Sequence, residues 1–202
     1  MRYHNLLEGQ NSRCIVVDVQ PIYTGLYDGN ELTWIDELMQ WLNRQGPILM
    51  FVNADDTGMT DESIGEIQQY WEDSGFDPGN WNRTEVVDKG YGYFRAWMDE
   101  GVPDNVIIKV IRLMYQQKVT DSRELFDGDE SDDYVEKMTQ LGVPEEMLDD
   151  GLSVEWTSVA QLKKYNGAYL MGGGREECLK EVQLLMNAFN IKYKLVQDFI
   201  YG

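Results

Sequence analysis

The chain is poor in the residues that most often carry nucleophilic or metal chemistry, because its 202 residues include two cysteines and one histidine. Cys14 and Cys178 are too few for a disulfide framework or for a structural zinc site built from several thiolates. The lone histidine, His4, precedes the first predicted strand, so a Ser-His-Asp or Cys-His pair is not expected. Any cysteine chemistry must therefore use one thiol without an imidazole.

Positive charge and long apolar runs are also scarce. There are 17 basic and 36 acidic residues, and the net charge of -19 opposes binding to duplex nucleic acid, which favours basic surfaces. No segment approaches the roughly 20 apolar residues of a membrane span, and the start of the chain lacks the apolar stretch of a signal peptide. We expect a cytoplasmic protein that does not bind membranes. Such acidity is equally typical of solubility or of salt adaptation in the source organism.

What is present is an alternation of apolar strands and amphipathic helices. Hydrophobic residues make up 43% of the chain, enough for the core of one domain spanning 1–202. Alternating strands and helices imply right-handed crossovers, so we predict a Rossmann-like three-layer α/β sandwich with a mostly parallel sheet of about five strands. The predicted strands are 14–18, 48–53, 85–89, 167–172 and 193–201. The predicted helices begin after Thr33 and at about 61–74, 94–100, 105–118 and 176–189.

One segment, 120–155, differs from the rest in charge. It contains 13 acidic residues and two basic ones, Arg123 and Lys137, and so holds more than half of the net negative charge. Its apolar residues Tyr134, Val135, Met138 and Leu141 follow a helical spacing, which predicts a solvated helical insertion. The insertion is a candidate lid or a surface for a basic protein partner.

Polar residues at the carboxyl ends of the predicted strands are the candidates for a site, because ligands of open parallel sheets bind at that edge. A lysine ammonium and a helix N-terminus both favour a thiolate, while a carboxylate can accept the thiol proton. Asp18, Lys89 and Cys178 therefore make a chemically sensible set without histidine. The full set of candidates is Asp18, Gln20, Asn53, Asp55, Asp56, Lys89 and the turn at 172–178.

Three short motifs resemble those of the isochorismatase-like cysteine hydrolases: VVDVQ at 16–20, KGYGYF at 89–94 and GGGREEC at 172–178. The resemblance implies that Cys178 is the nucleophile, Asp18 the base and Lys89 the polarising cation. It also implies a small amide- or ether-type substrate, no cofactor and a homo-oligomer. The N–H groups of Glu177 and Cys178 would form an oxyanion hole. Substrate contacts are then expected from Gln20, Asn53, Tyr93, Phe94, Gly173 and Glu177.

Structural interpretations of the same residues stay open. Cys178 shares a helical stripe with Val182, Leu185 and Phe189, as a small core residue would. The glycines at 172–174 suit a tight strand-to-helix turn more than a phosphate cradle, since no Lys-Ser/Thr of a P-loop follows them. A catalytically altered relative of the hydrolases is therefore an equal expectation.

Two further classes compete with the hydrolase. Oxygen ligands at the strand ends would suit Mg²⁺ or Mn²⁺, and this arrangement resembles the PIN-like nucleases. The third class is a binding protein without catalysis, in which 120–155 contacts a basic partner while the α/β domain supports it. The candidate metal ligands are Asp18, Asp55 or Asp56, Asp121, and Glu176 or Glu177.

Overall fold

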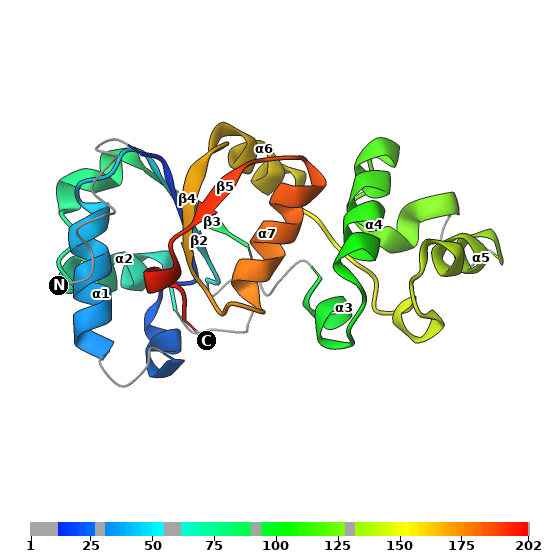
Figure 1. Cartoon of the computed structure of the whole chain (residues 1–202), viewed down its shortest axis with the longest axis horizontal. Coiled ribbons are helices and arrows are strands. Elements are labelled where there is room, and N and C mark those ends of the chain that lie inside the picture. The colour runs from blue at the N-terminus through cyan, green and yellow to red at the C-terminus, as the bar shows by residue number, and fades with distance from the viewer. Residues whose placement is uncertain (1–11, 27–30, 55–61, 90–93, 128–131, 202) are drawn as a thin grey trace. The chain divides into compact units, whose positions relative to one another are not determined.

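The computed structural model describes residues 12–26, 31–54, 62–89, 94–127 and 132–201. One sheet of five parallel strands lies in the order β3-β2-β1-β4-β5 (Figure 1). Because β1 lies in the middle, the direction in which the chain adds strands reverses between β1 and β4, and such switch points are where α/β sheets bind ligands. The strands are β1 (Cys14–Val17), β2 (Ile48–Val52), β3 (Thr84–Asp88), β4 (Ala168–Gly172) and β5 (Tyr193–Leu195).

Helices and short 3-10 helices connect these strands. The α-helices are α1 (Glu31–Leu42), α2 (Ile64–Asp73), α3 (Arg95–Asp99), α4 (Asp104–Gln117), α5 (Asp132–Leu141), α6 (Trp156–Lys164) and α7 (Cys178–Ala188). The 3-10 helices are η2 (Pro21–Leu26), η4 (Pro78–Arg83), η5 (Ser122–Asp127), η6 (Glu145–Met147) and η7 (Gln197–Phe199). Thr33 was expected to precede the first helix, but it lies within α1.

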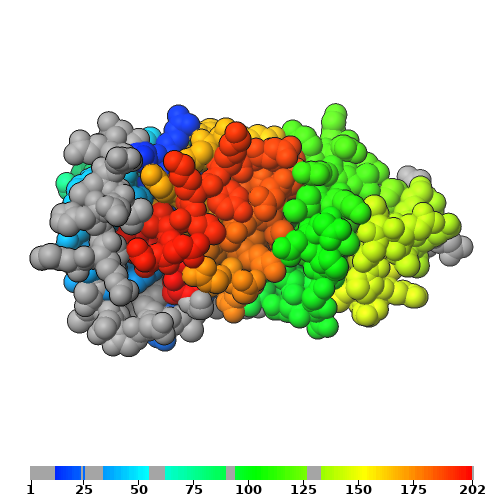
Figure 2. Space-filling view, viewed as in Figure 1, coloured from blue at the N-terminus to red at the C-terminus, as the bar shows by residue number. Residues whose placement is uncertain are grey.

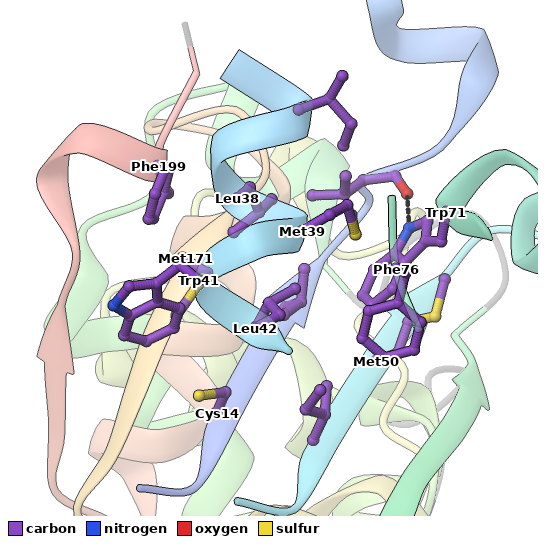
Figure 3. Packing of buried hydrophobic residues seen from close by; sticks show 14 of the residues in the cluster. Cys14, Leu38, Met39, Trp41, Leu42, Met50, Trp71, Phe76, Met171 and Phe199 are labelled. Atoms are coloured by element: carbon purple, nitrogen blue, oxygen red, sulfur yellow. Dashed lines mark hydrogen bonds between the residues drawn. The ribbon is translucent and has the colours of Figure 1, made fainter. Parts of the chain in front are cut away.

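Both faces of the sheet are buried, which explains the continuous apolar runs of its central strands. On one face, Leu38, Met39 and Leu42 of α1 lie over Cys14 and Met50 (Figure 3). On the opposite face the alternate residues Ile15, Val17, Leu49, Phe51 and Leu170 are equally buried. A parallel sheet covered on both faces is the expected three-layer Rossmann-like α/β fold, so the predicted fold class is confirmed.

The last predicted strand is shorter than expected. Pairing with β4 ends at Leu195, and the chain then turns into η7. Val196 and Phe199 pack into the buried cluster around α1, and the N–H of Phe199 donates to the carbonyl of Val196 at 2.9 Å. Apolar packing against α1 therefore replaces further strand pairing.

The chain divides into two compact units. Unit 1 consists of Met1–Tyr91, Lys164–Leu179 and Lys192–Gly202, and it contains all five strands. Unit 2 consists of Gly92–Lys163 and Lys180–Ile191. The acidic segment 120–155 lies entirely in unit 2, while its role as an insertion into a single domain stays a prediction.

The described part of the acidic segment is helical, as predicted, and contains η5, α5 and η6. Tyr134 and Met138 of α5 are buried, but Val135 is 38% exposed. The buried residues Tyr134 and Met138 are four positions apart and share one side of the helix, while Val135 lies on its solvated side. Among the described helices, none is both long and apolar enough to span a bilayer.

Candidate functional site

Asp18 lies directly after β1, at the switch point of the sheet. Its side chain is fully buried, and its φ of 49° is uncommon for any residue except glycine. Two hydrogen bonds hold its backbone: its N–H donates to the carbonyl of Phe51 at 2.9 Å, and its carbonyl accepts from the hydroxyl of Tyr201 at 2.6 Å. An unusual backbone conformation that neighbours hold in place is typical of functional sites.

Lys89 follows β3 and brings a positive charge to Asp18. Its Nζ lies 2.9 Å from Oδ2 of Asp18, and both side chains are completely shielded from solvent. Its backbone N–H donates to the carbonyl of Val52, so the end of β2 positions it. Among the described residues, no hydrogen-bond donor contacts Oδ1 of Asp18. A buried ion pair gives little net stability after desolvation, so its presence favours a functional role.

The last residue of β4 and the first residue of the turn that follows both have to be glycine. At Gly172, where φ is 78°, a Cβ would collide with the carbonyl oxygen of Val17 and lie 2.9 Å from Cγ2 of Val19. At Gly173, where φ is 59°, it would lie 2.9 Å from the N atom of Leu179. The close approach of the turn to β1 and to the first turn of α7 therefore explains the glycines, as the structural interpretation predicted.

This turn delivers Cys178 as the first residue of α7, where the thiol is partly buried. The N–H of Arg175 donates to the carbonyl of Tyr201 at 3.0 Å, so the C-terminal segment supports the turn. Figure 2 shows this segment (red) at the surface. A helix N-terminus favours a thiolate through the partial positive charge of its N–H groups.

A further residue at this edge of the sheet is Tyr23 in η2, which the sequence did not single out. Burial raises the pKa of Tyr23 above its usual value, and the negative charges of Asp18 and of a Cys178 thiolate raise it further. A hydrogen bond from Asn53 and the charge of Lys89 act in the opposite direction. Asn53 holds the Tyr23 phenol at the carboxyl end of β2, the edge of the sheet at which Asp18, Lys89 and Cys178 also follow their strands.

A buried amide network orients Tyr23. Gln20 accepts the backbone N–H of Asn53 at 2.8 Å and donates to its carbonyl at 2.9 Å, and it also donates to Glu62 at 2.9 Å. The side-chain amide of Asn53 then donates to the Tyr23 hydroxyl at 2.8 Å. Gln20 and Asn53 were expected to contact substrate, and in the structure their amides hold the end of β2 and the phenol.

The predicted oxyanion hole differs from the observed hydrogen bonding. The N–H of Glu177 donates to the carbonyl of Gly174 at 3.0 Å, because the turn closes on itself before α7 begins. The Glu177 side chain itself is exposed.

The remaining predicted substrate contacts are Tyr93 and Phe94. Tyr93 lies outside the described residues. Phe94 is buried in unit 2, where its N–H donates to the carboxylate of Glu181 at 3.1 Å.

The residues of the alternative metal site are not assembled in the part of the chain that the structure describes. No group of three or more potential ligands occurs there. Asp121 belongs to unit 2, where Arg123 lies 2.6 Å from its carboxylate and lowers its pKa. Glu176 is exposed, while Asp55 and Asp56 lie outside the described residues.

The other cysteine is part of the core. Cys14 is fully buried under α1, its thiol contacts the carbonyl of Ser12, and burial raises its pKa far above the ordinary value. A thiol with this environment is unreactive, so only Cys178 is a candidate nucleophile.

When the chain is compared with models of protein families, with curated proteins and with solved structures, nothing matches.

Proposed function

We propose that the protein is a cysteine hydrolase of the isochorismatase-like type that cleaves a small amide- or ether-type substrate. The observation that supports this most is the buried ion pair of Asp18 and Lys89, whose charges act on the same phenol as the thiol of Cys178. All four side chains belong to unit 1, at the carboxyl edge of its sheet.

For an amide substrate, Asp18 accepts the thiol proton and the sulfur of Cys178 attacks the carbonyl carbon. A C–S bond forms while the electron pair of the C=O bond moves to oxygen. Return of that pair breaks the C–N bond, and the proton held by Asp18 goes to the leaving amine. Water then attacks the thioester, releases the acid and regenerates the thiol.

Lys89 pairs with the carboxylate of Asp18 and provides positive charge at the edge of the sheet that Cys178 follows. A carboxylate that is fully buried needs a partner of opposite charge, because its solvation by water has been lost. The ammonium also favours the thiolate over the thiol. The pair thus serves as proton acceptor and electrostatic activator in a site without histidine.

The rate of alkylation of Cys178 by iodoacetamide, measured against pH, tests this proposal. We expect a midpoint well below the value of about 8.5 for a free cysteine. The double variant Asp18→Asn, Lys89→Met removes both charges without leaving one of them buried alone, and it should move the midpoint upward. Lys137→Met, which removes an exposed lysine paired with Asp133, is the matched control and should leave it unchanged.

The cysteine background is simple to control. Cys178→Ala keeps Cys14 and should show no labelling of the folded protein, because Cys14 is buried. An inert Cys178, or a midpoint at or above that of a free cysteine, would contradict the hydrolase.

A further inference from the structure

Resting on the proposed function, we propose that the phenolic O–H of Tyr23 is the hydrogen-bond donor that receives the oxyanion of the substrate when Cys178 attacks it. This assigns a catalytic role to a residue that none of the sequence motifs contains. It also defines the substrate as one with a carbonyl group, since an attacked carbonyl develops a negative oxygen that a neutral donor can bind.

The first argument is the direction of the phenol's hydrogen bonds. The side-chain amide of Asn53 donates to the Tyr23 oxygen at 2.8 Å, which uses the hydroxyl as an acceptor. The proton of the hydroxyl must then point elsewhere, and among the described residues no acceptor contacts it. A phenol has one donor and can accept from Asn53 at the same time, so the donor is free for a ligand.

The second argument is position. The hydroxyl of Tyr23 is held by Asn53 at the carboxyl end of β2, and Cys178 follows β4 at the same edge of the sheet, with β1 and Asp18 between them. The charges of Asp18, Cys178 and Lys89 also act on the phenol. A carbonyl group under attack by the Cys178 sulfur would therefore lie at the edge of the sheet to which the phenol belongs.

Protonation supports the same role. The raised pKa of Tyr23 means that the phenol keeps its proton at neutral pH and donates it in a hydrogen bond without losing it.

The third argument is the occupied backbone donor. The N–H of Glu177 donates to the carbonyl of Gly174, so it cannot also face a substrate oxygen while the turn is intact. The start of α7 thus lacks one of the two donors that such a hole requires. Tyr23, held by Asn53 on the other side of the switch point, supplies the missing one.

Two probes with different chemistry test this role. With 4-nitrophenyl acetate, the thiolate attacks the carbonyl carbon, the C=O electron pair moves to oxygen, and return of the pair expels 4-nitrophenolate and leaves an acetyl thioester. With iodoacetamide, the thiolate displaces iodide from a CH₂ group and no oxyanion forms. A donor to the oxyanion should therefore accelerate the first reaction only.

We expect Tyr23→Phe to slow the burst of 4-nitrophenolate roughly 100-fold, the usual cost of removing one oxyanion donor. Iodoacetamide alkylation of the same variant should change by about twofold or less. Both rates are measured at a pH where Cys178 is fully ionised, and thermal unfolding checks that the variant is folded. Tyr115→Phe, which alters an exposed tyrosine of unit 2, is the matched control and should leave both rates unchanged.

The outcomes separate the two proposals. A wild-type burst that Tyr23→Phe leaves unchanged would overturn the role of Tyr23 and leave the hydrolase standing. Equal slowing of both probes would also overturn it, since Tyr23 would then act on the thiol. If the wild type shows no burst beyond that of Cys178→Ala, the proposed function is overturned, and the role of Tyr23 with it.

Discussion

The hydroxyl of Tyr201 donates a hydrogen bond of 2.6 Å to the carbonyl of Asp18, across 183 positions of the sequence. It holds the backbone of a buried residue at a positive φ. We expect Tyr201→Phe to lower the free energy of unfolding by about 1–3 kcal/mol, because the buried carbonyl loses its partner. Urea denaturation measures this. Tyr115→Phe changes an exposed tyrosine and should cost about 0.5 kcal/mol or less; equal costs would contradict the role of this bond.

The ion pair of Asp18 and Lys89 makes a second prediction about stability. Lys89→Met alone should lower the free energy of unfolding by about 3–5 kcal/mol, because it leaves a buried carboxylate without a partner. The double variant Asp18→Asn, Lys89→Met should be more stable than this single variant, and Asn tolerates the positive φ at position 18. A double-mutant cycle in guanidinium chloride checks the coupling. Exposed Lys137→Met, which breaks the pair with Asp133, should cost about 0.5 kcal/mol.

If Lys89→Met lowers the free energy of unfolding no more than Lys137→Met does, the ion pair of Asp18 and Lys89 is not buried in solution. Additive effects in the cycle would likewise show that the two side chains do not interact.

Gly172 tests the geometry that places Cys178. Gly172→Ala should lower the free energy of unfolding by about 3 kcal/mol or more, because the added Cβ would collide with the carbonyl oxygen of Val17 and because φ is positive at this position. Gly167→Ala is a matched control with a similar φ of 84° and no atom within 4 Å of the added Cβ. It should cost only about 1 kcal/mol. Thermal unfolding of both variants measures the difference, and equal costs would mean that the turn does not lie against β1.

Tyr165 predicts a loss of stability in alkali. Burial raises the pKa of this phenol to about 12, with a further contribution from the negative charge of Glu85. The unfolded chain ionises at about 10, so the stabilisation is complete below that pH and is lost as the pH rises through about 12. Tyr165→Phe removes the hydrogen bond to the carbonyl of Ile48, and the wild type should be the more stable at pH 7.

That advantage should shrink between pH 10 and 12, as followed by urea denaturation at each pH. Parallel stability profiles for the two proteins across this range would contradict the raised pKa.

The fold and two of the site residues were predictable because they depend on short local patterns. The run CIVV before Asp18 has the composition of a buried parallel strand, and β1 has these bounds. Carboxyl ends of neighbouring parallel strands share one edge, so Asp18 and Lys89 could be expected to meet, and they form an ion pair.

The position of Tyr23 was not predictable, since it depends on contacts that no spacing encodes. The segment after β1 contains proline and glycine and indicates a loop, whereas it forms η2. Only the fold brings the amide of Asn53 to the phenol, from 30 positions away. The hydrogen bond from the N–H of Glu177 to the carbonyl of Gly174 likewise depends on how the glycine turn closes, which the sequence does not specify. A tyrosine five residues after a strand-end aspartate was the one signal in the sequence.

The position of β1 in the middle of the sheet also sets the order in which the site is completed. β1 pairs with β2 about 34 residues later, but its other neighbour is β4, and Val17 pairs with Gly172. During synthesis, one edge of β1 therefore stays unpaired until most of the chain has left the ribosome. Contacts so distant in sequence slow folding, and an unpaired strand edge can lead to aggregation. Cys178, six residues beyond Gly172, is therefore brought to the edge of β1 only in the last stage of folding.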